Sequence, residues 1–112
     1  MDHRSKAAEE YRKWYHWAAW KGPKGRRVAQ LQAEPLCRFC EAAGRITEAT
    51  SADHVQPHRG DYELFWSGEL QSLCKPCHDI AKQQVENRGY HDMSDAAGFP
   101  IDPNHPANKH RS

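Results

Sequence analysis

Long apolar segments are absent from this sequence. No run of apolar residues approaches the roughly 18 that a membrane-spanning helix needs, and no hydrophobic stretch near the start is typical of a secretory signal. These absences argue against a membrane protein and a secreted protein, so we expect a cytoplasmic location. Apolar residues make up 38% of the chain, and the mean hydropathy of -1.02 is low for a globular domain. A chain of 112 residues with so little apolar material buries a modest core, so we expect a metal to supply part of its stability.

A large excess of charge of one sign is also missing, because the net charge is only +1. The charges are unevenly distributed along the chain. Residues 1–36 carry 8 Lys/Arg against 4 Asp/Glu, residues 37–88 carry 6 against 8, and residues 89–112 carry 2 against 3. We therefore predict a basic, aromatic N-terminal helical segment, a core that contains every cysteine, and an irregular C-terminal tail that is at most partly docked. A local basic segment can contact phosphates without a high overall charge.

Hydrophobic periodicity and turn residues predict a mixed α+β chain. The expected elements are helices over 5–20 and 26–31, strands over 46–55 and 70–73, and a helix over 78–86. The loop between the two strands carries Phe65 and Trp66, which we expect to be buried as an apolar plug. The aromatic residues of the first helix are expected to pack on the core, and contact with DNA bases is the alternative.

Cations gather in the turn after the first predicted helix. Lys24, Arg26 and Arg27 lie around the flexible sequence Gly22–Gly25. A solvated basic face would explain them, and so would contact with a DNA backbone, whose affinity comes mainly from Lys and Arg at phosphates. Both interpretations remain open from the sequence.

The four cysteines form two C-x2-C pairs separated by 33 residues. A two-residue spacer lets both thiolates of a pair turn toward one ion, so Cys37, Cys40, Cys74 and Cys77 predict a closed tetrahedral Zn²⁺ site with a structural role. Two disulfides in a secreted protein are the alternative, which the missing signal disfavours. The long insert between the pairs must fold into something else.

Three side chains within and just after that insert suit metal-dependent chemistry. Asp53 and His54 are neighbours on the first predicted strand, so their side chains point to opposite faces. His78 follows Cys77 directly, so the zinc site would fix its direction. Asp53 and His78 could hold a divalent cation with positions open for water and a phosphate oxygen, and His54 could deprotonate the water.

These residues carry a family resemblance. The sequence resembles the zinc-containing, phage-type branch of the HNH endonucleases over residues 11–88. The matching residues are Asp53-His54, Pro57-His58-Arg59-Gly60-Asp61, Phe65-Trp66, Leu70-Gln71-Ser72-Leu73-Cys74 and Cys77-His78. The resemblance implies a ββα-metal core, with His54 as general base, Asp53 and His78 as ligands of Mg²⁺, Mn²⁺ or another divalent transition metal, and double-stranded DNA as substrate. It also implies a phage or prophage origin, for which the phage packaging machinery is one potential partner.

Two further positions follow from the resemblance. His58 and Arg59 fall in the loop that faces the substrate, so phosphate contact is expected, with a solvated loop position as the alternative for His58. Glu69 occupies the place of the Asn that gives the family its middle letter and braces the loop of the base. Glu accepts hydrogen bonds but donates none when ionised. Slower catalysis, recruitment of further metal and a subgroup variation are three open explanations.

Two functions fit the sequence. The first is a DNA endonuclease that nicks or cuts both strands, which uses Asp53, His54 and His78 together. The second is a catalytically weak or inactive zinc module that binds DNA, which needs the cysteines and the basic segment only. The sequence sets neither the sequence preference nor the oligomeric state.

Overall fold

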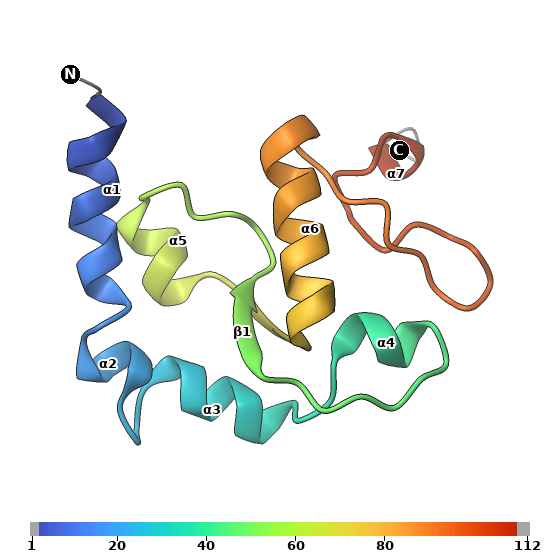
Figure 1. The fold of residues 1–112 in the computed structure, drawn as a ribbon, viewed down its shortest axis with the longest axis horizontal. Coiled ribbons are helices and arrows are strands. Elements are labelled where there is room, and N and C mark those ends of the chain that lie inside the picture. The colour runs from blue at the N-terminus through green and yellow to red at the C-terminus, as the bar shows by residue number, and fades with distance from the viewer. Residues whose placement is uncertain (1–2, 110–112) are drawn as a thin grey trace.

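The computed structural model describes residues 3–109, with side chains described from residue 9 onward. The elements are α1 (His3–Trp14), α2 (Ala18–Lys21), α3 (Arg26–Ala33), α4 (Arg38–Ala42), β1 (Ser51–His54), α5 (Tyr62–Ser67), β2 (Leu70–Leu73), α6 (Lys75–Arg88) and α7 (Pro106–Lys109). Figure 1 shows α1 and α6 standing on opposite sides of β1 and the loop that follows it. Within residues 3–109, no helix combines the length and the apolar character needed to cross a membrane.

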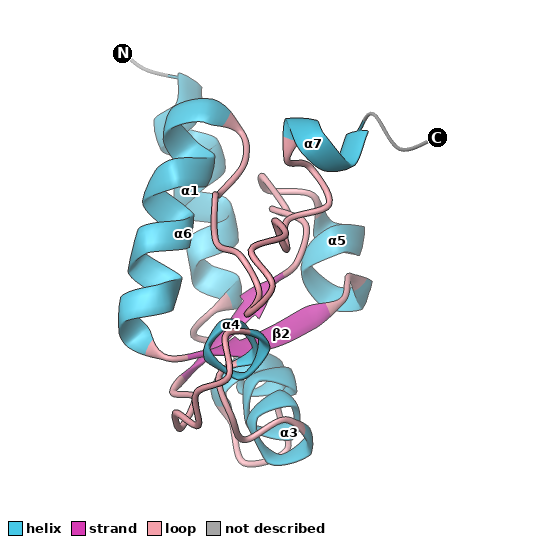
Figure 2. Ribbon diagram, turned by 90° about the vertical axis from the view of Figure 1, so that its right-hand side faces the viewer, coloured by secondary structure: helices cyan, strands magenta, loops and turns pink. Residues whose placement is uncertain are grey.

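A two-stranded antiparallel sheet lies at the centre of the chain (Figure 2). Its register pairs Ser51 with Leu73 and His54 with Leu70, and α6 begins directly after β2. Asp53 is paired with Gln71 in the same register. The predicted small α+β fold with a ββα core is confirmed.

The first predicted helix, over 5–20, is wrong in its length. The α1 helix ends at Trp14, and tight hydrogen bonds such as His16 N to Lys13 O (3.0 Å) lead into the short α2. Trp14 and Trp20 are both buried in one cluster. Six residues of a straight helix would separate their directions by about 120°. Breaking the helix therefore lets both tryptophans reach the same core.

The segment between the cysteine pairs also departs from the prediction. The strand expected over 46–55 is limited to Ser51–His54, and Ile46 is 86% exposed. The predicted loop contains α5, which begins after Asp61, whose side chain accepts a hydrogen bond from Leu64 N (3.1 Å). An acidic N-cap of this kind was the missed signal. Phe65 is fully buried, as predicted for the plug.

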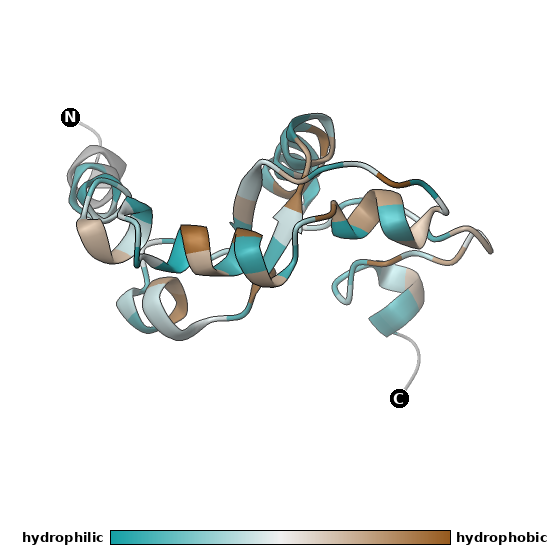
Figure 3. Cartoon of the chain, turned by 90° about the horizontal axis from the view of Figure 1, so that it is seen from below, coloured by the Kyte–Doolittle hydropathy of each residue, from teal (hydrophilic) through white to brown (hydrophobic). Residues whose placement is uncertain are grey.

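The hydrophobic interior contains two clusters, each of which includes a leucine of β2. One contains Cys37, Phe39, Cys40, Leu73, Cys74, Cys77 and Ala81. The other contains Trp14, Trp20, Phe65 and Leu70. Hydrophobic colour is confined to short stretches in Figure 3, which agrees with the scarcity of apolar residues. Each cluster is small, so the four cysteines of the first one (the cysteine cluster) form a large part of the interior.

The second cysteine pair is built into the start of α6, which begins three residues earlier than predicted. Pro76 lies in its first turn, where the missing N–H breaks no helical hydrogen bond. At the other end Gly89 adopts φ 87 and closes the helix. The α6 helix therefore rises directly from the cysteine cluster.

The C-terminal segment is mostly irregular, as expected, but it docks more extensively than predicted. Met93 and Ile101 pack against the cysteine cluster. Asp102 is buried and accepts hydrogen bonds from His91 N (2.9 Å) and Asn104 N (2.8 Å). The buried carboxylate accepts hydrogen bonds from backbone N–H groups in two segments of the tail. These bonds hold the tail against the core.

Candidate active site

An open cleft of about 850 Å³ lies between α1 and α6. The residues that line it are Tyr11 and Arg12 from α1, Tyr15 just after that helix, Asp53 and His54 from β1, Val55, Pro57, His58 and Arg59 from the following loop, Gln71 from β2, His78, Ala81, Lys82, Val85 and Glu86 from α6, and Gly89, His91, Asp102 and Asn104 from the tail. The three side chains singled out for chemistry therefore share one cleft. Tyr15 and Gln71 were not anticipated there.

Asp53 and His78 face each other within the cleft. Asp53 Oδ1 lies 3.7 Å from His78 Nε2, and both side chains remain about a quarter to a third exposed (33% and 26%). Bonds of roughly 2.0–2.2 Å place neighbouring ligand atoms of one divalent ion about 3–4 Å apart, so the pair fits a shared cation. His78 Nδ1 lies 3.4 Å from Asp79 Oδ1, an orientation that directs the other ring nitrogen toward Asp53.

His54 is buried at the floor of the cleft and lies in a fixed orientation. Its ring stacks on Trp20 with a centroid distance of 5.3 Å and an interplanar angle of 10°. Its Nε2 lies 3.0 Å from the carbonyl oxygen of Phe65, which can only accept, so Nε2 donates and the neutral ring keeps its lone pair on Nδ1. Burial lowers the pKa of His54 below its ordinary value, which favours this neutral form.

The four cysteines form a single buried cluster of free thiols. Their sulfur atoms all lie within 4.8 Å of one another, and Cys40 Sγ is 3.9 Å from Cys74 Sγ and 3.8 Å from Cys77 Sγ. Zn–S bonds of about 2.3 Å in a tetrahedron require sulfur separations of about 3.8 Å. Burial raises the pKa of Cys74 and Cys77, so thiolates here need a compensating cation. The cluster is compatible with the predicted zinc site, and its four cysteines form no disulfide in this structure.

Comparison with known proteins connects this geometry to a family. A scan of the chain against protein-family models gives no match. The crystal structure of the HNH endonuclease of the deep-sea thermophilic bacteriophage GVE2, containing a manganese ion, resembles this chain with a TM-score of 0.63 and 30% sequence identity. The similarity covers 79% of this chain and 98% of the phage protein. The chain belongs to the HNH endonuclease family. The resemblance seen in the sequence is therefore confirmed.

Two curated bacterial proteins are also similar to this HNH protein. The large subunits of exodeoxyribonuclease 7 from Bordetella parapertussis and Bordetella bronchiseptica are each 34% identical over 85 residues, which is 72% of this chain. The chain spans only 18% of the length of these relatives. Together with the phage enzyme, they support a nuclease role in general.

The two residues of the loop after β1 that are expected to contact phosphate, His58 and Arg59, have different surroundings. His58 is buried, its Nδ1 accepts a hydrogen bond from Gly60 N (2.9 Å), and its Nε2 lies 2.8 Å from Tyr15 Oη. Both ring nitrogens are therefore occupied inside the protein. Arg59 is exposed, lines the cleft and adopts φ 50, which is uncommon for a residue other than glycine. Phosphate contact stays a prediction for both residues, and the geometry favours Arg59.

The three cations around the start of α3 also have different surroundings. Arg26 donates from Nη1 to Phe65 O (2.6 Å) and from Nη2 to Gly68 O (2.7 Å), which commits its guanidinium to the end of α5. Arg27 donates one exposed hydrogen bond to Thr50 O (3.1 Å). Lys24 is exposed, so among these three it has the freest ammonium for DNA. DNA contact at these positions stays a prediction.

The two hydrogen bonds of Arg26 predict a structural role. We expect Arg26→Gln to lower the free energy of unfolding by about 2–3 kcal/mol, because hydrogen bonds from charged groups to two carbonyls of α5 and its C-cap are lost. Arg27→Gln is the matched control and is expected to change stability by less than about 0.5 kcal/mol, because it loses one exposed hydrogen bond. Urea unfolding of the zinc-loaded proteins measures both values. Equal stability of the two variants would contradict this role.

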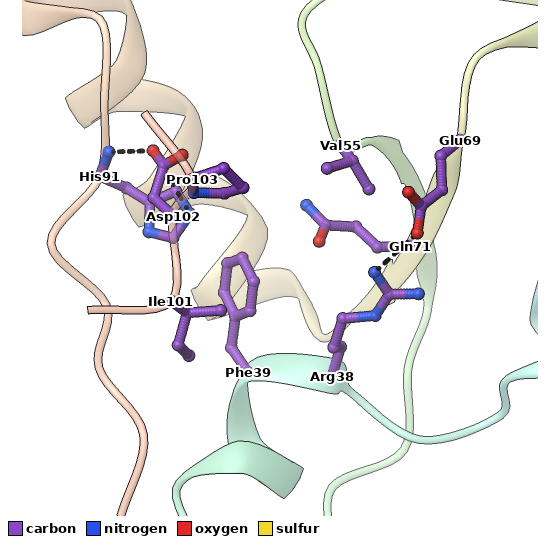
Figure 4. Close-up of a pocket in the computed structure, with 9 residues that line it drawn as sticks. All are labelled: Arg38, Phe39, Val55, Glu69, Gln71, His91, Ile101, Asp102 and Pro103. Carbon is purple, nitrogen blue, oxygen red and sulfur yellow. Dashed lines mark hydrogen bonds and ion pairs between the residues drawn. The ribbon is translucent and has the colours of Figure 1, made fainter. Parts of the chain in front are cut away.

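Glu69 occupies the position of the family Asn, directly before β2, and its side chain is directed toward Arg38 of α4. Its side chain is 70% exposed, and a carboxylate oxygen lies 3.5 Å from Arg38 Nη1. A smaller pocket of about 200 Å³ separates these residues from His91 and Asp102 of the tail, as Figure 4 shows. The backbone of Glu69 holds the residue that follows His54, because its carbonyl oxygen accepts a hydrogen bond from Val55 N (3.0 Å). The Glu69 side chain is therefore paired with α4 in this structure.

Proposed function

We propose that this HNH protein is a metal-dependent endonuclease that hydrolyses phosphodiester bonds of double-stranded DNA. One observation carries the proposal. A single cleft holds a carboxylate and an imidazole facing each other at 3.7 Å, together with a second imidazole whose Nδ1 is available as a proton acceptor. Residues 37–88 are the proposed catalytic unit, flanked by the N-terminal helical segment and the tail.

His54 is the proposed general base. A water near Nδ1 would transfer its proton to the ring, and the hydrogen bond from Nε2 to the Phe65 carbonyl would strengthen as the ring gains charge. Asp53 and His78 would hold a divalent cation, which supplies positive charge to the scissile phosphate. A mixed carboxylate and imidazole ligand set suits Mn²⁺ or Ni²⁺ at least as well as Mg²⁺. The exposed cations Arg12, Arg59 and Lys82 line the same cleft and are proposed to contact the DNA backbone.

The test is cleavage of supercoiled plasmid by zinc-loaded protein. We expect nicked or linear DNA with Mn²⁺, Ni²⁺ or Mg²⁺, no product with EDTA, and recovery of activity when Mn²⁺ is restored. Asp53→Ala should lose at least about 100-fold in rate, because one of two proposed ligands is missing. Glu63→Ala, which removes an exposed carboxylate of α5 outside the cleft, should cleave like the wild type.

A second function is kept open by one observation. Glu69 replaces the family Asn, and its side chain is exposed and paired with Arg38 of α4. If purified, folded protein cleaves with none of these metals, a zinc module that binds DNA without cutting it is the better description. Retention of duplex DNA by that protein, measured by fluorescence anisotropy at low salt, would then support this alternative.

The biological setting is also a proposal. The solved relative is a phage protein, which supports a phage or prophage origin and a place of action in the cytoplasm of a bacterial host. Association with the phage packaging machinery, nicking as opposed to double-strand cleavage, and the oligomeric state stay predictions.

A further inference from the structure

Hydrogen bonds through His58 connect the loop after β1 to Tyr15, the residue that follows α1. Gly60 N donates to His58 Nδ1 (2.9 Å), and His58 Nε2 lies 2.8 Å from Tyr15 Oη. Tyr11 and Phe65 pack edge-on against the His58 ring, with centroid distances of 5.0 Å in both cases. The ring is therefore held in place on several sides.

The positions of the hydrogens in this chain can be assigned by counting donors. A backbone N–H can only donate, so His58 Nδ1 must be an acceptor. Burial and the neighbouring His54 lower the pKa of His58 to about 4, so the ring is neutral near pH 7 and carries one hydrogen. That hydrogen is on Nε2, which therefore donates to Tyr15 Oη.

Tyr15 then has a hydroxyl hydrogen that His58 does not use. Among the described residues, His58 is the one hydrogen-bond partner of Tyr15 Oη. The Tyr15 ring is packed edge-on against Trp20 (5.4 Å) and Phe65 (4.8 Å), which fixes its direction. The residue lines the cleft together with Asp53 and His54. A fixed hydroxyl thus offers one spare donor at the site.

We propose that Tyr15 is a further catalytic residue, whose hydroxyl donates a hydrogen bond to a non-bridging oxygen of the scissile phosphate. The inference rests on the proposed nuclease function, since a phosphate must occupy the cleft. One non-bridging oxygen would face the cation that Asp53 and His78 are proposed to hold. The other would need a hydrogen-bond donor as negative charge develops on it. Burial, and next the charge of Asp53, raise the pKa of Tyr15 to about 12, so the hydroxyl keeps its hydrogen throughout the pH range of an assay.

The kinetic test compares Tyr15→Phe with the wild type at saturating DNA. We expect kcat to fall about 10- to 100-fold with KM changed by less than about threefold, because the lost bond is strongest to a charged transition state. Tyr62→Phe is the matched control, since its hydroxyl is on an exposed side chain outside the cleft, and it should cleave normally. Zinc content and the thermal melt show that each variant is folded.

A second measurement does not depend on cleavage. ¹⁵N NMR of the wild-type histidine rings should show His58 protonated at Nε2 and bare at Nδ1. The opposite tautomer would overturn the proposal, because the Tyr15 hydroxyl would then donate its hydrogen bond to His58 Nε2. Wild-type kcat in Tyr15→Phe, with His54→Ala inactive, would also overturn it while leaving the nuclease function intact. Normal cleavage by His54→Ala would instead contradict the assigned general base.

Discussion

Replacing His54 with alanine is expected to reduce the rate of plasmid cleavage by a factor of about 10² to 10⁴, the usual contribution of a general base. The structure gives the physical reason. The hydrogen bond from Nε2 to Phe65 O holds the ring in the tautomer whose Nδ1 can accept a proton, and stacking on Trp20 prevents rotation. Alanine removes the acceptor without touching Asp53 or His78.

A loss of activity in His54→Ala could also come from the cavity that it creates, so two further variants are needed. His54→Gln can still donate to the Phe65 carbonyl and fills most of the space, yet it cannot accept a proton near pH 7. It should fold like the wild type and be as inactive as the alanine variant. His16→Ala removes an exposed histidine outside the cleft and should be fully active. Rapid cleavage by His54→Gln would show that the base lies elsewhere.

Replacing Cys74 with serine is expected to abolish cooperative folding. Cys74 belongs to the cysteine cluster and is also the residue from which α6 begins. Zinc binding to a structural site of this type is worth about 10–16 kcal/mol, whereas a small domain is stable by about 5–15 kcal/mol in total. With so few apolar residues in each cluster, the remaining packing is not expected to compensate. A thermal melt followed by circular dichroism, with metal content measured on the same sample, checks this result.

The matched control for Cys74→Ser is His78→Ala, which removes a proposed ligand of the second metal and leaves all four cysteines in place. It should retain one zinc and a cooperative melt while losing cleavage. A reducing agent should affect neither the melt nor the zinc content of the wild type, because the four thiols are free. A Cys74→Ser protein that melts like the wild type would refute the structural zinc site.

The ββα order and the family were predictable because their signals are local. Metal ligands are specified by residue type and short spacing, so two C-x2-C pairs and the Asp53-His54 dipeptide can be recognised without a fold. The bounds of α1 and the existence of α5 were not predicted. The first depends on where Trp14 and Trp20 find their shared partner Phe65, and the second on a weak N-cap signal at Asp61. The first is decided by packing and the second by helix capping, and hydrophobic periodicity reports neither.

The sequence by itself determined which side chains are candidates for binding metal and moving protons, and the adjacency of Cys77 and His78 that links the proposed closed site to the proposed open site. Only the tertiary structure decided what each polar group is free to do. Arg26 and Phe65 are 39 residues apart in the chain, and Tyr15 and His58 are 43 apart, yet each pair is joined by a hydrogen bond. Such partners follow no local pattern, because burial requires a polar group to bond to whatever neighbour the fold supplies. For that reason only the fold shows that Arg26 and His58 are bonded within the protein, and that Tyr15 lies beside the cleft.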